Sequence, residues 1–189
     1  MNRVLPQVTG RAKVGEVLEC STGEWSGTPE ISFSQVWLLD GVAIAGEVQS
    51  TYKVRQEDEG HVLSCQVLAS NAAGVSKPAR SVGVSVPVLP VNRVAPMITG
   101  GLKAGETMSC TSGTWTGTPT LNYVYEWRRS TATISGANHD TYEVHGEDEG
   151  HALLCQVTAI NSAGSVSAVS NTVVVPEEAK KRQEEEAAV

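Results

Sequence analysis

The strongest constraint in this sequence is an internal repeat, in which residues recur after an offset of 90 without a gap. The matched positions include Cys20 with Cys110, Trp25 with Trp115, Trp37 with Trp127, Cys65 with Cys155, and the block 57–61 with the block 147–151. A period of this length predicts duplication of a domain of about 85–90 residues rather than a short solenoid unit. We therefore expect two domains, over residues 1–88 and 89–176.

Each repeat carries the sequence pattern of β-strands. Apolar and polar residues alternate over residues 14–20, 62–69 and 82–86, which is typical of half-buried strands. Glycine, proline, asparagine and aspartate mark turns every ~8–12 residues, the spacing of a sandwich or a barrel. No helical period appears before residue 176. The sequence therefore predicts an all-β fold.

The four cysteines are placed symmetrically. Cys20 and Cys65 are separated by 45 residues, and so are Cys110 and Cys155. The lack of a Cys-x-x-Cys pair argues against a zinc site made of cysteines. Two equal long loops predict two structural disulfides, one per repeat, each contributing ~4 kcal/mol in the chain-entropy model. The alternative is four buried, reduced cysteines that act as small hydrophobic residues.

The first residues and the cysteines point to different compartments. The start, MNRVLPQVTG, does not have the apolar stretch of a secretory signal, because Pro6 and Gln7 interrupt it. Disulfides, however, form in oxidising surroundings. A protein made in a cytoplasm and then released, for example within a virus particle, satisfies both observations. The alternative is a chain trimmed of its signal.

Composition and motifs exclude several functions. The net charge of −7 disfavours a basic surface for nucleic acid, and no apolar run reaches the ~20 residues that a membrane span needs. Because nucleophile-elbow, phosphate-loop and dinucleotide motifs are missing, we expect no catalytic residue, cofactor or metal. His61 and His151 follow acidic residues, and a metal site there is the less favoured interpretation. We expect Asp58 and Asp148 to accept backbone N–H bonds in a turn.

The order of motifs resembles a known group of domains. Each repeat contains G-E-x-x-x-C-x-x-G-x-W-x-G-x-P, then a second tryptophan, then T-Y-x-V, then D-E-G-H-x-L-x-C-x-V-x-A-x-N-x-x-G. This order resembles the immunoglobulin-like repeats of bacterial surface proteins and of tailed-phage virion proteins, such as capsid decoration proteins, over about residues 4–86 and 94–175. The resemblance implies two tandem immunoglobulin-like β-sandwiches, with Trp37 and Trp127 as core residues against the disulfides.

Two further segments lie outside the repeats. VPVLP, over residues 86–90, joins them, and its two prolines favour an extended, semi-rigid linker. Residues 177–189 form a short charged C-terminal tail of helix-forming residues without an apolar face. The tail is expected to be either a solvated segment or a short helix that docks on a partner.

Aromatic and arginine side chains are the candidates for partner contact. The tryptophans in the turn-rich Gly-x-Trp-x-Gly segments either anchor an interface or stack on a sugar, or else close the end of the core. The second repeat also has tyrosines and an arginine pair where the first does not, and these residue types are enriched at interfaces. The candidates are Trp25, Trp115, Tyr123, Tyr125, Arg128 and Arg129.

These observations lead to two hypotheses of function. The first is a non-enzymatic virion protein of a tailed phage that decorates or reinforces the capsid or particle surface and aids attachment to the host. Its expected partners are a capsid or other virion protein, a host surface polysaccharide and a second copy of the chain, with no nucleic acid and no membrane span. The second is a bacterial cell-surface module for adhesion or glycan binding. The expected locations are the virion and the bacterial cell surface, respectively.

Overall fold

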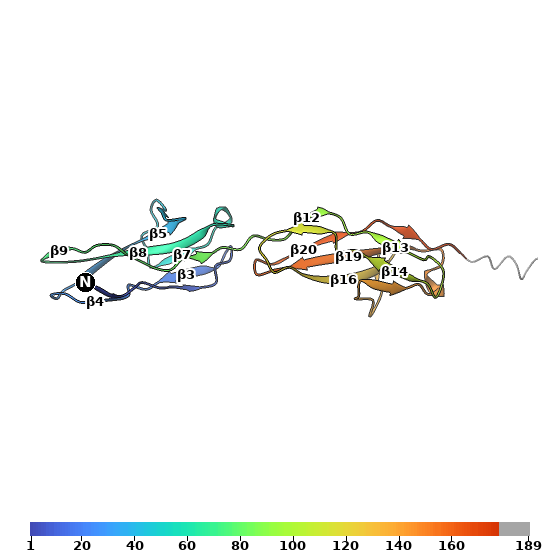
Figure 1. Ribbon diagram of the computed structural model, residues 1–189, viewed down its shortest axis with the longest axis horizontal. Helices are drawn as coiled ribbons and strands as arrows, with labels where there is room; N and C mark the ends of the chain where they lie inside the picture. Colours follow the sequence, from blue (N-terminus) through green and yellow to red (C-terminus); the bar gives the residue numbers. More distant parts are fainter. Residues whose placement is uncertain (178–189) are drawn as a thin grey trace, which may run out of the picture. The chain divides into compact units, whose positions relative to one another are not determined.

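The protein is described by a computed structural model over residues 1–177 (Figure 1). The chain divides into two units, Met1–Val88 and Leu89–Val189, called domain 1 and domain 2 below. The division falls within the VPVLP segment. The tail predicted over residues 177–189 lies outside the described residues except for Glu177.

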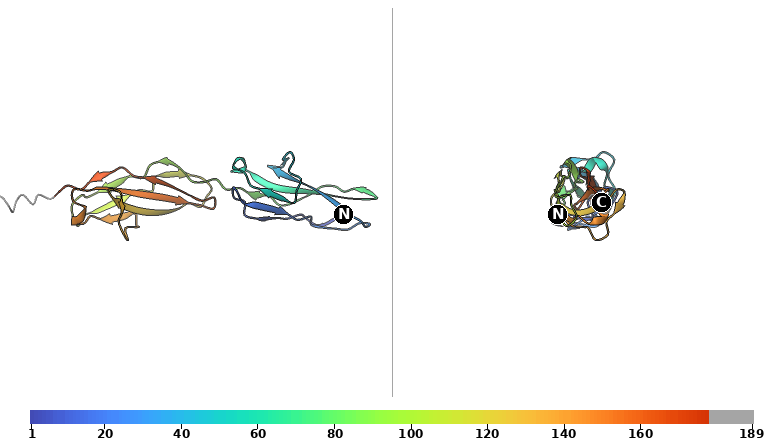
Figure 2. Two further views of the ribbon diagram at one scale, coloured as in Figure 1. Left: turned by 180° about the vertical axis from the view of Figure 1, so that it is seen from behind. Right: turned by 90° about the vertical axis from the view of Figure 1, so that its right-hand side faces the viewer.

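Domain 1 consists of two antiparallel sheets that face each other, plus a short third pair (Figures 1 and 2). The first sheet has the order β2-β3-β7, and the second has the order β10-β8-β5-β6, with β9 and β11 also paired to β8. The third pair is β1-β4. The strands are β1 (Asn2–Val4), β2 (Val8–Gly10), β3 (Val17–Cys20), β4 (Glu24–Trp25), β5 (Ser32–Leu39), β6 (Val42–Ala43), β7 (Thr51–Lys53), β8 (Val62–Asn71), β9 (Gly74–Val75), β10 (Ala79–Arg80) and β11 (Val84–Ser85).

Domain 2 repeats this arrangement. Its sheets have the orders β13-β14-β18 and β17-β16-β19-β20, with β21 paired to β19 and a separate pair β12-β15. The strands are β12 (Val91–Val94), β13 (Ile98–Gly100), β14 (Thr107–Cys110), β15 (Thr114–Thr116), β16 (Asn122–Arg129), β17 (Ala132–Thr133), β18 (Thr141–Glu143), β19 (Ala152–Ile160), β20 (Ser165–Val169) and β21 (Val173–Val174). The continuous β20 takes the place of the two short strands β9 and β10 of domain 1.

The long strand at the centre of each second sheet shows why the sequence folds this way. In β8, every second residue is buried, namely Leu63, Cys65, Val67 and Ala69, while the residues between them are more exposed. Successive side chains of a strand point to opposite faces, so this alternation directs one apolar row into the core. β19 has the same alternation. The predicted strand over residues 62–69 is confirmed.

A disulfide bond joins the two sheets of each domain. Cys20 on β3 is bonded to Cys65 on β8, with 6.2 Å between the two Cα atoms. Cys110 on β14 is bonded to Cys155 on β19, with 6.5 Å between the Cα atoms. The structure therefore contains the disulfide alternative rather than four reduced cysteines.

A buried tryptophan packs beside each disulfide. Trp37 lies opposite Cys65 in the β5–β8 register, and its indole N–H donates a hydrogen bond to the Gln49 carbonyl at 3.0 Å. Trp127 has the equivalent place and donates to the His139 carbonyl at 2.9 Å. Strand order, inter-sheet disulfide and this tryptophan together define the immunoglobulin-like sandwich. The predicted fold class is confirmed.

The helical elements within residues 1–177 are two short 3₁₀ turns, η1 (Gln56–Asp58) and η2 (Gly146–Asp148). Each turn precedes the long central strand of its domain and contains the acidic residues of the duplicated block. No helix in this part of the chain has the length and apolar character needed to cross a membrane.

Candidate binding surfaces

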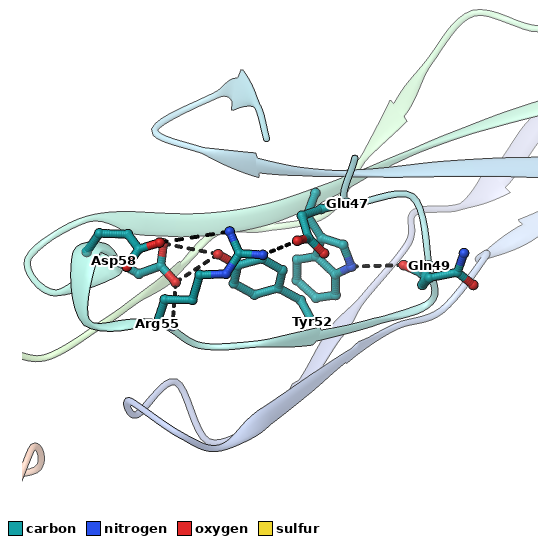
Figure 3. A network of polar contacts seen from close by, with 7 residues as sticks. Glu47, Gln49, Tyr52, Arg55 and Asp58 are labelled. Carbon is teal, nitrogen blue, oxygen red and sulfur yellow. Dashed lines mark hydrogen bonds and ion pairs between the residues drawn. The ribbon is translucent and has the colours of Figure 1, made fainter. Parts of the chain in front are cut away.

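A buried tyrosine–aspartate pair organises the turn in each domain. In domain 1, the Tyr52 hydroxyl donates to Asp58 Oδ2 at 2.9 Å, and the Arg55 backbone N–H donates to the same oxygen at 2.8 Å (Figure 3). In domain 2, the Tyr142 hydroxyl donates to Asp148 Oδ2 at 2.8 Å. Both carboxylates are buried, with 1% and 0% of the residue exposed. The acidic block therefore closes a turn, as the sequence predicts.

The arginine that supports this pair in domain 2 comes from a neighbouring strand. Arg129, the last residue of β16, donates from Nε to Asp148 Oδ1 at 2.6 Å and from Nη2 to Glu147 Oε1 at 2.7 Å. The Arg129 side chain is 22% exposed, whereas the Asp148 side chain is fully buried. The buried negative charge thus has a direct cationic partner, which offsets much of the cost of removing it from water.

Domain 1 places its arginine differently. Leu39 stands at the position equivalent to Arg129, and the nearby cation is Arg55, which precedes η1. The Arg55 guanidinium lies 5.2 Å from the centre of the Tyr52 ring and forms an ion pair with Glu47 (Figure 3). The cation of domain 1 therefore lies over the tyrosine ring, on an exposed side chain, rather than against the buried carboxylate.

These environments shift the acidities of the paired groups. Burial, and then the hydrogen bond to the aspartate, raises the pKa of Tyr52 and of Tyr142 to about 12. Burial opposes ionisation of Asp148, but the His145 amide, Arg129 and the Tyr142 hydroxyl outweigh burial and hold its pKa below the usual value. Because both carboxylates are enclosed, these pairs stabilise the fold and do not form an open reaction site.

The histidines of the acidic blocks lie near the surface. His61 Nδ1 is 2.6 Å from Asp40 Oδ2, and both side chains are about half exposed. Ser130 stands at the position equivalent to Asp40, so domain 2 does not repeat this contact. Over residues 1–177, no group of three or more histidine, cysteine, aspartate or glutamate side chains is arranged to hold a metal ion.

Trp25 lies beside a pocket in domain 1. Its indole N–H donates to the Thr22 carbonyl at 2.7 Å, and its ring is half-buried at 6.2 Å from the Phe33 ring. We call the pocket of about 210 Å³ beside it the Trp25 pocket. Its lining residues are Met1, Trp25, Ser26, Gly27, Ile31, Ala69, Ser70, Asn71, Ala73, Gly74, Val75 and Ser76.

Trp115, the equivalent residue of domain 2, has a different environment. Its indole N–H makes the same kind of bond, to the Ser112 carbonyl at 2.7 Å, but the residue is only 8% exposed. It lies 6.5 Å from the Tyr123 ring, centre to centre, and Tyr123 itself remains 37% exposed. Trp115 is thus buried, whereas Trp25, which packs against the domain 1 core cluster, stays half-exposed and borders a pocket.

Strand β16 divides the other predicted contact residues between two faces. Trp127 is buried and Tyr125 packs against the core cluster, so the odd-numbered residues face inward. The opposite face carries Val124, which is 50% exposed, and Arg128, which pairs with Glu126 at 2.6 Å. A second pocket, of about 260 Å³, is lined by Val124 and Glu126 of this outward face together with Tyr125, and we call it the Val124 pocket. Its lining residues are Val124, Tyr125, Glu126, Thr133, Ile134, Ser135, Gly136, Ala137, Asn138, Gln156 and Thr158.

The structure corrects the expected contact surface in two respects. Trp115 is buried and Arg129 is occupied by the Asp148 ion pair, so both belong to the interior framework. Trp25, Tyr123 and Arg128 remain accessible, in three different settings. Sequence reasoning missed Val124 and the cross-strand partners of the Val124 pocket, because strand pairing brings them together from separate segments.

Comparison with known proteins gives structural likenesses alone. No protein-family model matches the chain, and no curated protein matches it either. Among solved structures, a titin variant containing domains I67–I69 is 21% identical, with a TM-score of 0.39, over 89% of this chain and 64% of that one. The N-terminal eight immunoglobulin domains of DSCAM are 22% identical, with a TM-score of 0.42, over 88% of this chain and 24% of that one.

A third likeness is to the chicken interferon gamma receptor alpha chain, at 10% identity and a TM-score of 0.31, over 91% of this chain and 98% of that one. The chain thus spans less than two thirds of the titin and DSCAM chains. The fold assignment rests on the strand order, the disulfides and the buried tryptophans of the protein itself.

Proposed function

We propose that this chain is a non-enzymatic structural protein on the surface of a tailed-phage particle, where it decorates or reinforces the particle and aids host attachment. The observation that carries the proposal is that the two domains share the same internal framework, whereas their exposed surfaces differ. The disulfide, the core tryptophan and the tyrosine–aspartate pair occur in both domains. The motif order that resembles virion and surface repeats supports the same interpretation.

The proposal assigns the docking contact to the outward face of β16 in domain 2. Val124, Glu126 and Arg128 lie there beside the Val124 pocket, while β5 of domain 1 has Ser34, Val36 and Leu38 at the equivalent positions. An exposed apolar residue next to charged ones is the composition of a protein interface with a polar rim. Domain 1 would then be presented away from the particle.

The location of the native protein tests the proposal directly. Quantitative mass spectrometry would compare purified phage particles with envelope fractions of the host. We expect recovery with the particles, in a fixed ratio to a capsid protein. Absence from particles together with enrichment in the envelope would contradict the proposal and favour the bacterial adhesion module instead.

A pair of matched variants tests the docking face. Val124→Glu introduces a charge into the proposed contact, and Ser34→Glu introduces the same charge at the equivalent exposed position of domain 1. When each purified variant is added to particles lacking the protein, we expect Val124→Glu to reduce bound protein at least tenfold and Ser34→Glu to leave it unchanged. Equal binding by both variants would exclude this face as the contact.

A further inference from the structure

One side of β16 carries backbone groups without partners. Trp127 donates a hydrogen bond to the Ala137 carbonyl and accepts one from the Ile134 N–H, so both of its backbone groups point away from β19. Because the direction of these groups alternates along a strand, the N–H and C=O groups of Tyr123 and Tyr125 point the same way. Within residues 1–177, none of these four groups forms a hydrogen bond. The sheet is therefore open on this side of β16.

We call residues 122–126, on this open side, the β16 edge. The β16 edge lacks lysine, proline and any bulge, which are devices that commonly prevent a sheet edge from pairing. Its sequence is Asn-Tyr-Val-Tyr-Glu, and its register with β19 is continuous. Tyrosine and valine favour strands, and Val124 and Tyr123 remain 50% and 37% exposed. The β16 edge is therefore suited to accept one more strand.

The neighbouring parts of the chain leave such an edge open in both domains. Phe33 and Gln35 are the equivalents of Tyr123 and Tyr125, and their backbone groups form no hydrogen bond within the described part of the chain. Domain 1 is followed by the linker and another domain, and domain 2 is preceded by both. Neither edge is nevertheless paired along these residues, so each is available to a separate polypeptide.

The Val124 pocket lies at the β16 edge. Its lining combines three consecutive residues of β16 with residues 133–138, and this segment bonds to Trp127 on the open side of the strand. Val124 and Ile134 provide apolar surface. Glu126 is the one charged residue among those of residues 1–177 that line the pocket. A strand added to the β16 edge would therefore place a side chain next to an apolar surface and a carboxylate.

Glu126 determines which side chain the pocket favours. Its Oε1 accepts hydrogen bonds from Arg128 Nε at 2.6 Å and from Thr133 Oγ1 at 3.2 Å, whereas its Oε2 accepts none from the described residues. The Arg128 bond lowers the pKa of the Glu126 carboxyl, which is therefore ionised at neutral pH. A lysine or arginine fits this lining, because its methylene stem can lie on Val124 and Ile134 while its cation reaches the carboxylate.

A second copy of the chain does not provide this side chain. If two β16 edges paired antiparallel around Val124, the four free groups of each would bond to those of the other. In that register Asn122 of one copy lies opposite Glu126 of the other. No basic residue then reaches the carboxylate, so the pocket favours a different partner.

We propose that the β16 edge binds an extended strand of a partner protein, which pairs antiparallel with residues 122–126 and places a lysine or arginine in the Val124 pocket. Main-chain hydrogen bonds to Tyr123 and Tyr125 would supply affinity, and the pocket would supply specificity. This strand would belong to the particle protein that makes the docking contact proposed above, so the identity of the partner rests on that proposal.

The test is a titration of the ¹⁵N-labelled full chain with the capped peptide Thr-Val-Lys-Val-Thr, and it requires no particles. When the lysine lies opposite Val124, the two valines lie opposite Tyr123 and Tyr125 and exchange main-chain hydrogen bonds with them. We expect saturable downfield shifts and slower exchange of these two amides, with a dissociation constant of roughly 0.1–1 mM for so small a contact.

Matched peptides separate backbone pairing from side-chain contact. N-methylation of either valine removes a donor that faces β16 and should weaken binding at least roughly tenfold. N-methylation of the lysine alters a donor that faces away, so the affinity should stay within roughly twofold. Glutamate in place of the lysine should weaken binding roughly tenfold, because it brings a second carboxylate to Glu126.

Variants of the protein test the pocket. Glu126→Gln should weaken binding of the lysine peptide roughly two- to fivefold, the effect of losing one exposed ion pair. Glu143→Gln, on exposed β18 of the other sheet, is the matched control and should bind like the parent chain. The amides of Phe33 and Gln35 are the internal control and should shift less, because domain 1 has Val36 in place of Glu126.

Three results of the titration would overturn the proposal. These are no saturable shift of Tyr123 and Tyr125 up to about 2 mM peptide, equal binding of the two kinds of N-methylated peptide, and equal binding of the lysine and glutamate peptides. Shifts of these amides with protein concentration alone, together with the mass of a dimer in sedimentation, would assign the β16 edge to a second copy and also overturn it.

The titration and the location of the protein can fail separately. Recovery of the chain with particles, together with a failed titration, would contradict strand addition and leave the location standing. A successful titration, together with absence of the chain from particles, would support strand addition and contradict only the location.

Discussion

The two domains hold a buried carboxylate at the same place but surround it with different cations. In domain 2, Arg129 reaches across from β16 and bonds directly to Asp148. In domain 1, Arg55 lies over the Tyr52 ring and pairs with Glu47 on the exposed side. A duplicated fold can therefore keep a buried carboxylate at the same place with an arginine bonded directly to it in one domain and an arginine over the neighbouring tyrosine ring in the other.

The domains also differ around an equivalent pair of glycines. Leu89 lies against Gly117 and Gly164 in domain 2, whereas Gly27 and Gly74 of domain 1 line the Trp25 pocket. The disulfides and the core tryptophans, in contrast, are alike in the two domains. We therefore expect equivalent changes in the shared framework to lower the stability of the two domains equally. Equivalent changes at the arginines and at these glycines should affect the two domains unequally.

The largest expected effect is on the shared framework. Replacing Cys20 and Cys65 by alanine, or Cys110 and Cys155, should lower the stability of the affected domain by about 4 kcal/mol, because each bond closes a loop of the same length. Denaturant titration followed by the indole NMR signals of Trp37 and Trp127 would report each domain separately. If the loss of stability in one domain were less than half of the loss in the other, the two frameworks would not be equivalent.

The arginines provide the next comparison. Arg129→Leu gives domain 2 the residue that domain 1 carries and leaves Asp148 without its direct partner, so we expect a loss of about 3 kcal/mol from domain 2. Arg55→Leu removes an exposed cation that makes no side-chain bond to the buried carboxylate, so we expect a much smaller loss from domain 1. The same denaturant titration measures both variants, and equal losses would contradict the assignment of Arg129 as the supporting charge.

The contact of Leu89 with domain 2 is tested by placing alanine at two equivalent glycines, Gly117 and Gly27. Gly117 has a φ of 142°, which alanine rarely adopts, and its methyl group would meet the Leu89 carbonyl oxygen. We expect Gly117→Ala to destabilise domain 2 by about 2 kcal/mol, and Gly27→Ala to change domain 1 by less than about 0.5 kcal/mol. Hydrogen exchange of β15 and β4 would locate the effects, and loss of protection in both would contradict a domain 2-specific contact.

The sequence predicted the framework because its signals are local or periodic. The offset of 90, the alternation in residues 62–69 and the paired cysteines each specify a feature that the fold then contains. The duplicated Thr-Tyr and Asp-Glu-Gly-His blocks were visible too, but their spacing alone did not show that Tyr52 bonds to Asp58. A bond between residues of a strand and a following turn depends on the path of the chain between them.

The candidate surfaces were harder to predict, because they depend on differences between nearly identical repeats. Trp25 and Trp115 occupy equivalent positions in the sequence, yet Trp115 is buried and Trp25 is half-exposed. Arg128 and Arg129 are neighbours, but strand alternation sends one outward and the other to Asp148. The direction of a side chain in a strand, together with its cross-strand neighbours, decides which residue remains available to a partner.

The smallest expected effect on stability is that of alkaline pH, and we expect it to be similar in the two domains. The pKa of Tyr52 and of Tyr142 is raised from about 10 in the unfolded chain to about 12 in the folded one. Each tyrosine therefore contributes stability that is fully present below pH 10 and is lost as the pH rises toward 12. The loss of stability at pH 11 is roughly 1.4 kcal/mol per domain. Denaturant titrations between pH 9 and pH 11 would measure the loss.

Phenylalanine variants identify the source of this pH dependence. Tyr52→Phe and Tyr142→Phe should each remove the alkaline loss from their own domain, because the ionising group is gone, and leave it in the other. Since the pKa of each tyrosine is raised to about 12 beside differently placed arginines, we expect similar slopes in the two parent domains. A steeper slope in either domain would mean that the position of the cation, rather than burial and the aspartate bond, sets the acidity of the tyrosine.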